Sequence, residues 1–136
     1  MTNNWAIALR QVQNTGYWIS RDVLSSQGEI DDNPTPPEFL RLTLPQPPPA
    51  LAKTIVYQFE DMSGEQWLVR TENIGESIVG QTAIAQYISM PDTTAIYKYD
   101  ALSQIGTLTF TIKATSGNVP VTRQYEAMQR VPAPTP

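Results

Sequence analysis

Alternation of apolar and polar residues with a period of two dominates the chain, which is typical of strands with one buried face. The clearest stretch is "GTLTFTIKA" (106–114), where Leu108, Phe110 and Ile112 share one face and threonines occupy the other. The turn-forming residues "TSGN" follow, and then "VPVTRQYEAM" (119–128) alternates again. This order predicts a β-hairpin over 105–128, in which Arg123 is a single charge on an otherwise apolar face.

A second hairpin is predicted over 53–71. Apolar residues alternate in "KTIVYQFE" and again in "EQWLVRT". Asp61 and Gly64 bracket the four residues between these stretches, and both residue types are typical of tight turns.

Four further segments give weaker strand patterns. "WAIALRQV" places Trp5, Ile7 and Leu9 on one side, and "NTG" then turns the chain into "YWISRDVL". "TTAIYKYD" alternates in the same way, and "FLRLTL" is flanked by prolines, which favours an edge strand because missing N–H donors cost least there. Residues 74–90 fit either a helix or a strand. Two glycines in that stretch each weaken a helix by about 1 kcal/mol relative to alanine, so we favour strand or loop.

Seven or eight short strands joined by turns, with no βαβ rhythm, predict an all-β protein. We expect an antiparallel β-sandwich or small β-barrel with extended Pro-rich arms. The predicted organisation has N-terminal strands of the β-domain in 1–30 and a Pro-rich extended arm in 31–53. The main β-domain follows in 54–130, with an extended C-terminal tail in 131–136.

The two arms are the candidate interaction segments. Residues 31–53 hold seven of the twelve prolines, and the tail "VPAPTP" has proline at every second position. Proline-rich backbone is already restricted before it meets a partner, so docking it costs less entropy than docking a flexible loop. The predicted interface residues are Phe39, Leu40, Leu42, Leu44, Pro45, Pro47, Pro48, Pro49, Arg123, Val131, Pro132, Pro134 and Pro136.

Charge and hydropathy exclude several classes of partner. Charged residues make up 16% of the chain, the net charge is −4, and the nine Lys and Arg residues are scattered. A nucleic-acid partner is therefore disfavoured, because binding to phosphates requires clustered cations. No run approaches the roughly 18 apolar residues that a membrane-spanning helix needs. Neither a basic stretch nor a signal-like apolar run opens the sequence, so we expect a cytoplasmic protein unless it belongs to a particle.

Candidate chemistry is sparse. The chain has no His and no Cys, which removes the commonest general base, the thiol nucleophile and the usual zinc ligands. The acidic stretch "GEIDDN" (28–33) could attract a hard cation, but it lacks the spacing of a calcium-binding loop and is more simply a turn. We predict no catalytic residue, no metal and no cofactor, and therefore a protein that is not an enzyme.

The threonine-rich alternation of "IGTLTFTIKATSGNVPVTRQYEAM", the segment "PTPPEFLRLTLPQPPPALAK" and the end "VPAPTP" together give the chain a recognisable style. In this style it resembles the small β-rich structural proteins of tailed bacteriophage virions. The resemblance implies a head-decoration, head–tail connector, tail or baseplate protein, located in the virion, with itself and other structural proteins as partners. The alternative is a cellular β-barrel that binds a small apolar ligand or a peptide.

Overall fold

The fold is described by a computed structural model for residues 3–26, 28–44 and 49–130. The described residues form one helix and eight strands. In chain order they are α1 (Asn4–Ser25), β1 (Ile30–Asp31), β2 (Glu38–Leu44), β3 (Lys53–Met62), β4 (Glu65–Ile74), β5 (Ser77–Gln86), β6 (Thr94–Asp100), β7 (Ile105–Ser116) and β8 (Val119–Arg130).

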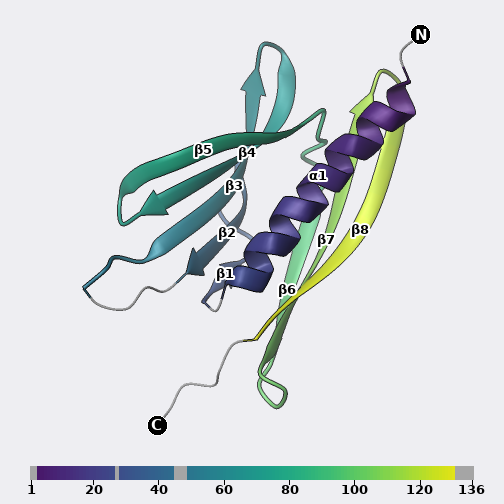
Figure 1. Ribbon diagram of the computed structural model, residues 1–136. Helices are drawn as coiled ribbons and strands as arrows, with labels where there is room; N and C mark the ends of the chain where they lie inside the picture. The colour runs from purple at the N-terminus through teal and green to yellow at the C-terminus, as the bar shows by residue number, and fades with distance from the viewer. Residues whose placement is uncertain (1–2, 27, 45–48, 131–136) are drawn as a thin grey trace.

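The strands form two antiparallel sheets, and α1 lies diagonally across the molecule beside the second sheet (Figure 1). Sheet A is a meander in the order β1-β2-β3-β4-β5, and sheet B has the order β6-β7-β8. Tyr87 joins the two sheets, because its N–H donates to the carbonyl of Gln66 in β4 while its own carbonyl accepts from Thr115 in β7.

The two predicted hairpins are confirmed as β3–β4 and β7–β8. The first turn is tighter than expected, because the strands continue to Met62 and Glu65 and only two residues connect them. Ser63 and Gly64 have φ values of 57° and 81°, the left-handed pair that suits the twist of a two-residue hairpin. Within 74–90, where strand or loop was favoured over helix, the structure has strand β5, and the predicted strand "TTAIYKYD" is confirmed as β6.

The predicted N-terminal strands are wrong, because residues 4–25 form a single helix. Asn3 caps it, with its side-chain oxygen accepting from the N–H of Ala6 at 3.1 Å. The residues that reach the core are Ala8, Val12, Ile19 and Val23, and this spacing is helical. The apparent alternation of Trp5, Ile7 and Leu9 is therefore coincidental, since Trp5 is half exposed.

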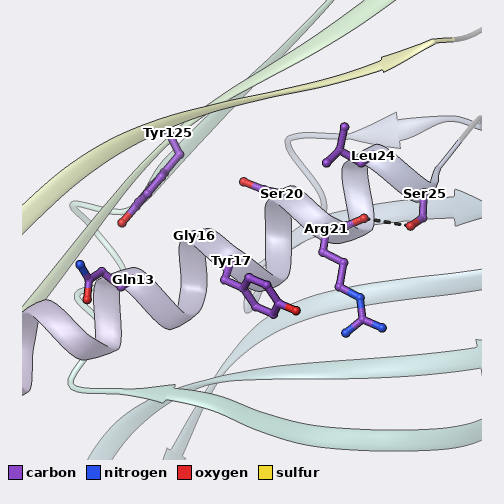
Figure 2. A pocket seen from close by; sticks show the side chains of 8 residues that line it. All are labelled: Gln13, Gly16, Tyr17, Ser20, Arg21, Leu24, Ser25 and Tyr125. Atoms are coloured by element: carbon purple, nitrogen blue, oxygen red, sulfur yellow. Dashed lines mark hydrogen bonds between the residues drawn. The ribbon is translucent and has the colours of Figure 1, made fainter.

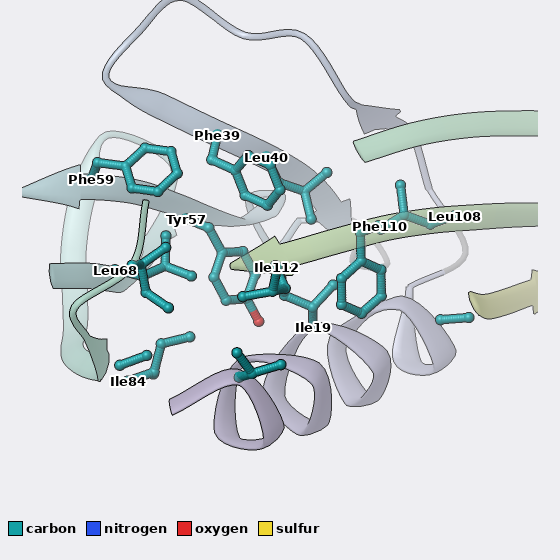
Figure 3. Close-up of a cluster of buried hydrophobic side chains, with 14 of the residues drawn as sticks. Ile19, Phe39, Leu40, Tyr57, Phe59, Leu68, Ile84, Leu108, Phe110 and Ile112 are labelled. Carbon is teal, nitrogen blue, oxygen red and sulfur yellow. The ribbon is translucent and has the colours of Figure 1, made fainter. Parts of the chain in front are cut away.

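One continuous core joins the helix and both sheets (Figure 3). Ile19 of α1, Tyr57 of β3 and Phe110 of β7 are among its fully buried side chains. The protein is thus mostly β, with two antiparallel sheets packed around one core and covered by one helix. The sheets are not closed into a barrel. Of the two predicted architectures, β-sandwich or small β-barrel, the barrel is therefore wrong.

The first half of the predicted 31–53 arm is part of the domain instead. Residues 38–44 form β2, which pairs with β3 along its length. Phe39, Leu40 and Leu42 are buried in the chain's own core, so they are wrong as interface residues. The strand predicted over "FLRLTL" is confirmed as β2. It is not an edge strand along its whole length, because β1 pairs with it at Arg41 and Leu42.

Candidate functional site

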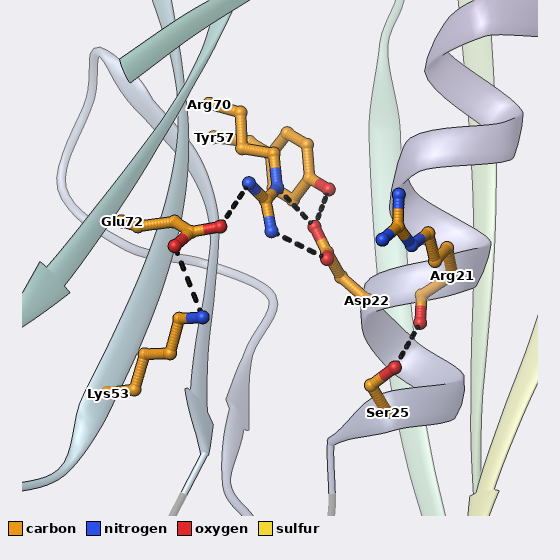
Figure 4. A network of polar contacts seen from close by, with 7 residues as sticks. All are labelled: Arg21, Asp22, Ser25, Lys53, Tyr57, Arg70 and Glu72. Atoms are coloured by element: carbon orange, nitrogen blue, oxygen red, sulfur yellow. Dashed lines mark hydrogen bonds and ion pairs between the residues drawn. The ribbon is translucent and has the colours of Figure 1, made fainter. Parts of the chain in front are cut away.

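The inner face of α1 carries a buried ion pair. Asp22 accepts two hydrogen bonds from the guanidinium of Arg70 in β4, at 2.7 and 2.9 Å, and a third from the hydroxyl of Tyr57 in β3 (Figure 4). All three side chains are buried. The fork-shaped Arg70 contact fixes both the distance and the orientation of the helix relative to sheet A.

The network continues outward from Arg70. Its guanidinium also donates to Glu72 at 2.6 Å, and Glu72 pairs with Lys53 at 3.1 Å. Burial, together with the charge of the neighbouring Asp22, raises the pKa of Tyr57, so this phenol stays protonated and donates. The hydrogen bond from Arg70 lowers the pKa of Glu72 and keeps it ionised. Arg70 thus favours the charged form of Glu72, and every charge in the network has an oppositely charged partner.

The pKa of Arg70 responds to opposing influences. Burial lowers it, but the hydrogen bonds from its guanidinium to Asp22 and Glu72 raise it by more, so the net shift is upward. Trp18 covers the guanidinium, with the Arg70 Cζ atom 5.0 Å from the ring centroid. This cluster is enclosed and internally satisfied. Its arrangement suits fastening the helix to the sheet and offers no group poised for proton transfer or nucleophilic attack.

The outer face of α1 borders an open groove of about 770 Å³. Side chains from successive helical turns line it together with Tyr125 of β8 (Figure 2). Tyr17 is 63% exposed and Leu24 is 69% exposed, which are large values for apolar side chains. Exposed apolar residues that gather along one groove are typical of interaction surfaces, whereas isolated ones carry little meaning.

Gly16 allows α1 to lie close to Tyr125 at the groove. A Cβ atom at this position would lie 2.6 Å from the ring of Tyr125, so a side chain here would collide with that ring. Tyr125 in turn stacks on Phe110, with ring centroids 5.4 Å apart. The helix can approach β8 this closely only because residue 16 has no side chain.

The exposed charges of α1 are basic. The helix has three charged residues: Arg10 and Arg21 are exposed, and Asp22 is buried against Arg70. Arg21 lies over Trp18 at 5.5 Å from the ring centroid and lines the groove, where no carboxylate accompanies it. A protein with a net charge of −4 thus presents an apolar groove edged by a positive charge.

The remaining predicted interface residues are dispersed. Leu44 is partly buried against the core and Pro49 is exposed. Arg123 is exposed on β8, and its guanidinium donates to the backbone oxygen of Thr122 at 3.0 Å. The others lie outside the described residues, namely Pro45, Pro47, Pro48, Val131, Pro132, Pro134 and Pro136.

Sequence reasoning missed both features of α1. The signal for the helix was the spacing of Ala8, Val12, Ile19 and Val23, which are 4, 7 and 4 residues apart. The strand prediction used Trp5, Ile7 and Leu9 instead and overlooked this spacing. No local signal points to the Asp22–Arg70 pair, because its members are 48 residues apart in the sequence.

Two absences hold for the part of the chain that the structure describes. It contains no cluster of three or more acidic side chains placed to hold a metal ion. Nor does it contain a helix that is both long and apolar enough to cross a membrane. In comparisons with known proteins, no family model, curated protein or solved structure matches the chain.

Proposed function

We propose that this protein is a non-enzymatic structural subunit of a larger homo-oligomeric assembly. The observation that carries the proposal is the groove on the outer face of α1, where Tyr17 and Leu24 expose apolar surface beside Arg21. Burying these exposed side chains against another molecule is favourable, and a subunit of an assembly would bury them on association.

The buried polar cluster supports the same proposal. Asp22, Arg70 and Tyr57 satisfy one another and fix the helix in place. A helix held in this way presents its outer face in one orientation. A preorganised surface lowers the entropy cost of association, which suits a subunit of an assembly.

The setting we propose is the virion of a tailed bacteriophage, as a head-decoration, connector, tail or baseplate component. This part of the proposal follows from the resemblance in sequence style. The partners are then further copies of the chain and other structural proteins. The proline-rich stretch at Pro45–Pro49 and the tail 131–136 are proposed as secondary arms that reinforce the contact.

Sedimentation velocity of the full chain over a wide concentration range tests the proposal. We expect association that rises with concentration, and we expect truncation after Arg130 to weaken it without changing the melting temperature. Replacing Pro47, Pro48 and Pro49 by glycine should act in the same direction. A chain that stays monomeric at every concentration while binding an extended peptide would instead favour the peptide-binding alternative.

A further inference from the structure

The β3–β4 hairpin ends in an exposed acidic tip. Glu60, Asp61 and Glu65 lie beside the two-residue turn, and every residue from Asp61 to Glu65 is exposed. The hairpin projects from one end of sheet A (Figure 1). No Lys or Arg lies between Lys53 and Arg70, so these carboxylates have no cation near them in the sequence. The tip is therefore a convex surface of negative charge.

An apolar side chain stands within this tip. Met62 is 36% exposed and pairs with Glu65 across the ladder, next to the turn. Methionine is unbranched and polarizable, and it adapts to irregular apolar pockets. The tip thus combines one apolar projection with three surrounding carboxylates.

The groove on α1 offers the opposite properties. It is concave and apolar along Tyr17 and Leu24, its charged lining residue is Arg21, and no carboxylate lines it. Arg10 lies exposed on the same helix, three turns earlier. Shape and charge of the groove are therefore complementary to those of the hairpin tip, and both belong to the same chain.

We propose that the groove on α1 of one copy receives the β3–β4 tip of a second copy. Met62 then contacts the apolar lining, and the carboxylates lie near Arg21. This inference rests on the proposed role as an assembly subunit and names the surfaces through which copies associate. Contacts of groove with groove or tip with tip would bring like charges together, so the complementary pairing is head to tail.

A head-to-tail contact has a consequence for the form of the assembly. After one contact forms, the copy that supplied the groove still has a free tip and the copy that supplied the tip still has a free groove, so the contact can repeat. Such heterologous contacts produce a closed ring if the rotation between copies closes, and an open filament if it does not. A two-fold symmetric dimer forms only if that rotation is 180°, with each copy's tip in the other's groove.

Charge reversal tests the pairing. The groove variant is Arg21→Glu and the tip variant is Asp61→Lys combined with Glu65→Lys, each studied in the full chain by sedimentation velocity. Each variant alone should associate at least about tenfold more weakly than the unmodified chain, because like charges now face each other. An equimolar mixture should regain association, since each variant's tip is complementary to the other's groove. Raising the salt concentration should weaken association of the unmodified chain.

Lys98→Glu is the matched control for the groove variant. It also replaces one exposed cation by a carboxylate, so both variants carry a net charge of −6 instead of −4, but it lies on β6. It should associate like the unmodified chain. Leu24→Glu provides a second groove variant that leaves the Arg21–Trp18 contact intact, and melting curves verify that every variant folds.

The possible outcomes separate the two proposals. If the unmodified chain associates but neither reversal weakens it, the hairpin is not the occupant, while the assembly role stands. If only the groove variant fails to associate, the groove receives a surface other than the hairpin tip, and the proposed pairing is overturned. If the unmodified chain is monomeric at all concentrations, the assembly role and this inference both fail, and the groove serves a different protein.

Discussion

The inner and outer faces of α1 differ in how completely their side chains are satisfied. On the inner face, Val12, Ile19 and Val23 are fully buried, and Asp22 accepts three hydrogen bonds. On the outer face, Tyr17 and Leu24 lie mostly in solvent. The inner face holds the helix against the sheets, and the helix presents its outer face to solvent. Substitutions on the inner face should therefore lower stability, and substitutions on the outer face should weaken association.

The largest expected effect comes from Asp22→Asn. The change keeps the shape of the side chain but removes the buried counter-charge of Arg70, which then has only the more exposed Glu72 as an anionic partner. Breaking a buried pair in this way costs about 3–5 kcal/mol of unfolding free energy. Urea denaturation of the variant and the unmodified chain measures the difference.

The control for this variant is Glu38→Gln, which breaks the more exposed ion pair between Glu38 and Arg41 at 2.8 Å. Exposed pairs contribute about 0–1 kcal/mol, so this variant should unfold almost like the unmodified chain. Equal losses for the two variants would show that burial of the Asp22 pair is not what makes it important.

The sequence predicted the sheets better than the helix for physical reasons. In β7, every second side chain from Leu108 to Ala114 is buried, so local alternation reports the fold directly. In α1, Gly16 and the preceding Asn-Thr favour a turn locally. The helix continues through them because its inner face packs against both sheets, and such tertiary packing overrides local preference.

The candidate site was even less accessible to sequence reasoning. The groove combines residues of α1 with Tyr125, at least 100 positions away in the chain, and only folding brings them together. The proline-rich segments drew attention because proline is conspicuous in a sequence. The exposed residues of the groove are ordinary residue types, and only their positions in the fold distinguish them.

A smaller effect is expected at the boundary between helix and sheet, from Gly16→Val. The new side chain would collide with the ring of Tyr125, which is held by its stacking on Phe110. Overpacking of this kind costs about 1–3 kcal/mol, even though a glycine is removed from a helix. Combining it with Tyr125→Ala should relieve the collision, so the two changes should be strongly non-additive in thermal or urea unfolding.

Gly80→Val is the matched control for that prediction. A Cβ atom at residue 80 would meet nothing within 4 Å, and the position lies in an exposed part of β5. It should change the unfolding free energy by no more than about 0.5 kcal/mol. If Gly16→Val were equally harmless, the close approach of α1 to β8 would not depend on the missing side chain.

The smallest effect on stability is expected from Leu24→Ala, and comparison with its neighbour Val23→Ala makes it informative. Val23 is fully buried, so its truncation removes core contacts and should cost about 2 kcal/mol, whereas truncating the 69% exposed Leu24 should cost no more than about 0.5 kcal/mol. Association should show the reverse order: Leu24→Ala should self-associate more weakly than Val23→Ala, because only Leu24 belongs to the groove. Urea unfolding and sedimentation velocity on the same two proteins measure both quantities. A loss of association that merely followed the loss of stability would mean that the outer face has no separate role, because a helix displaced from its sheet would present neither surface correctly.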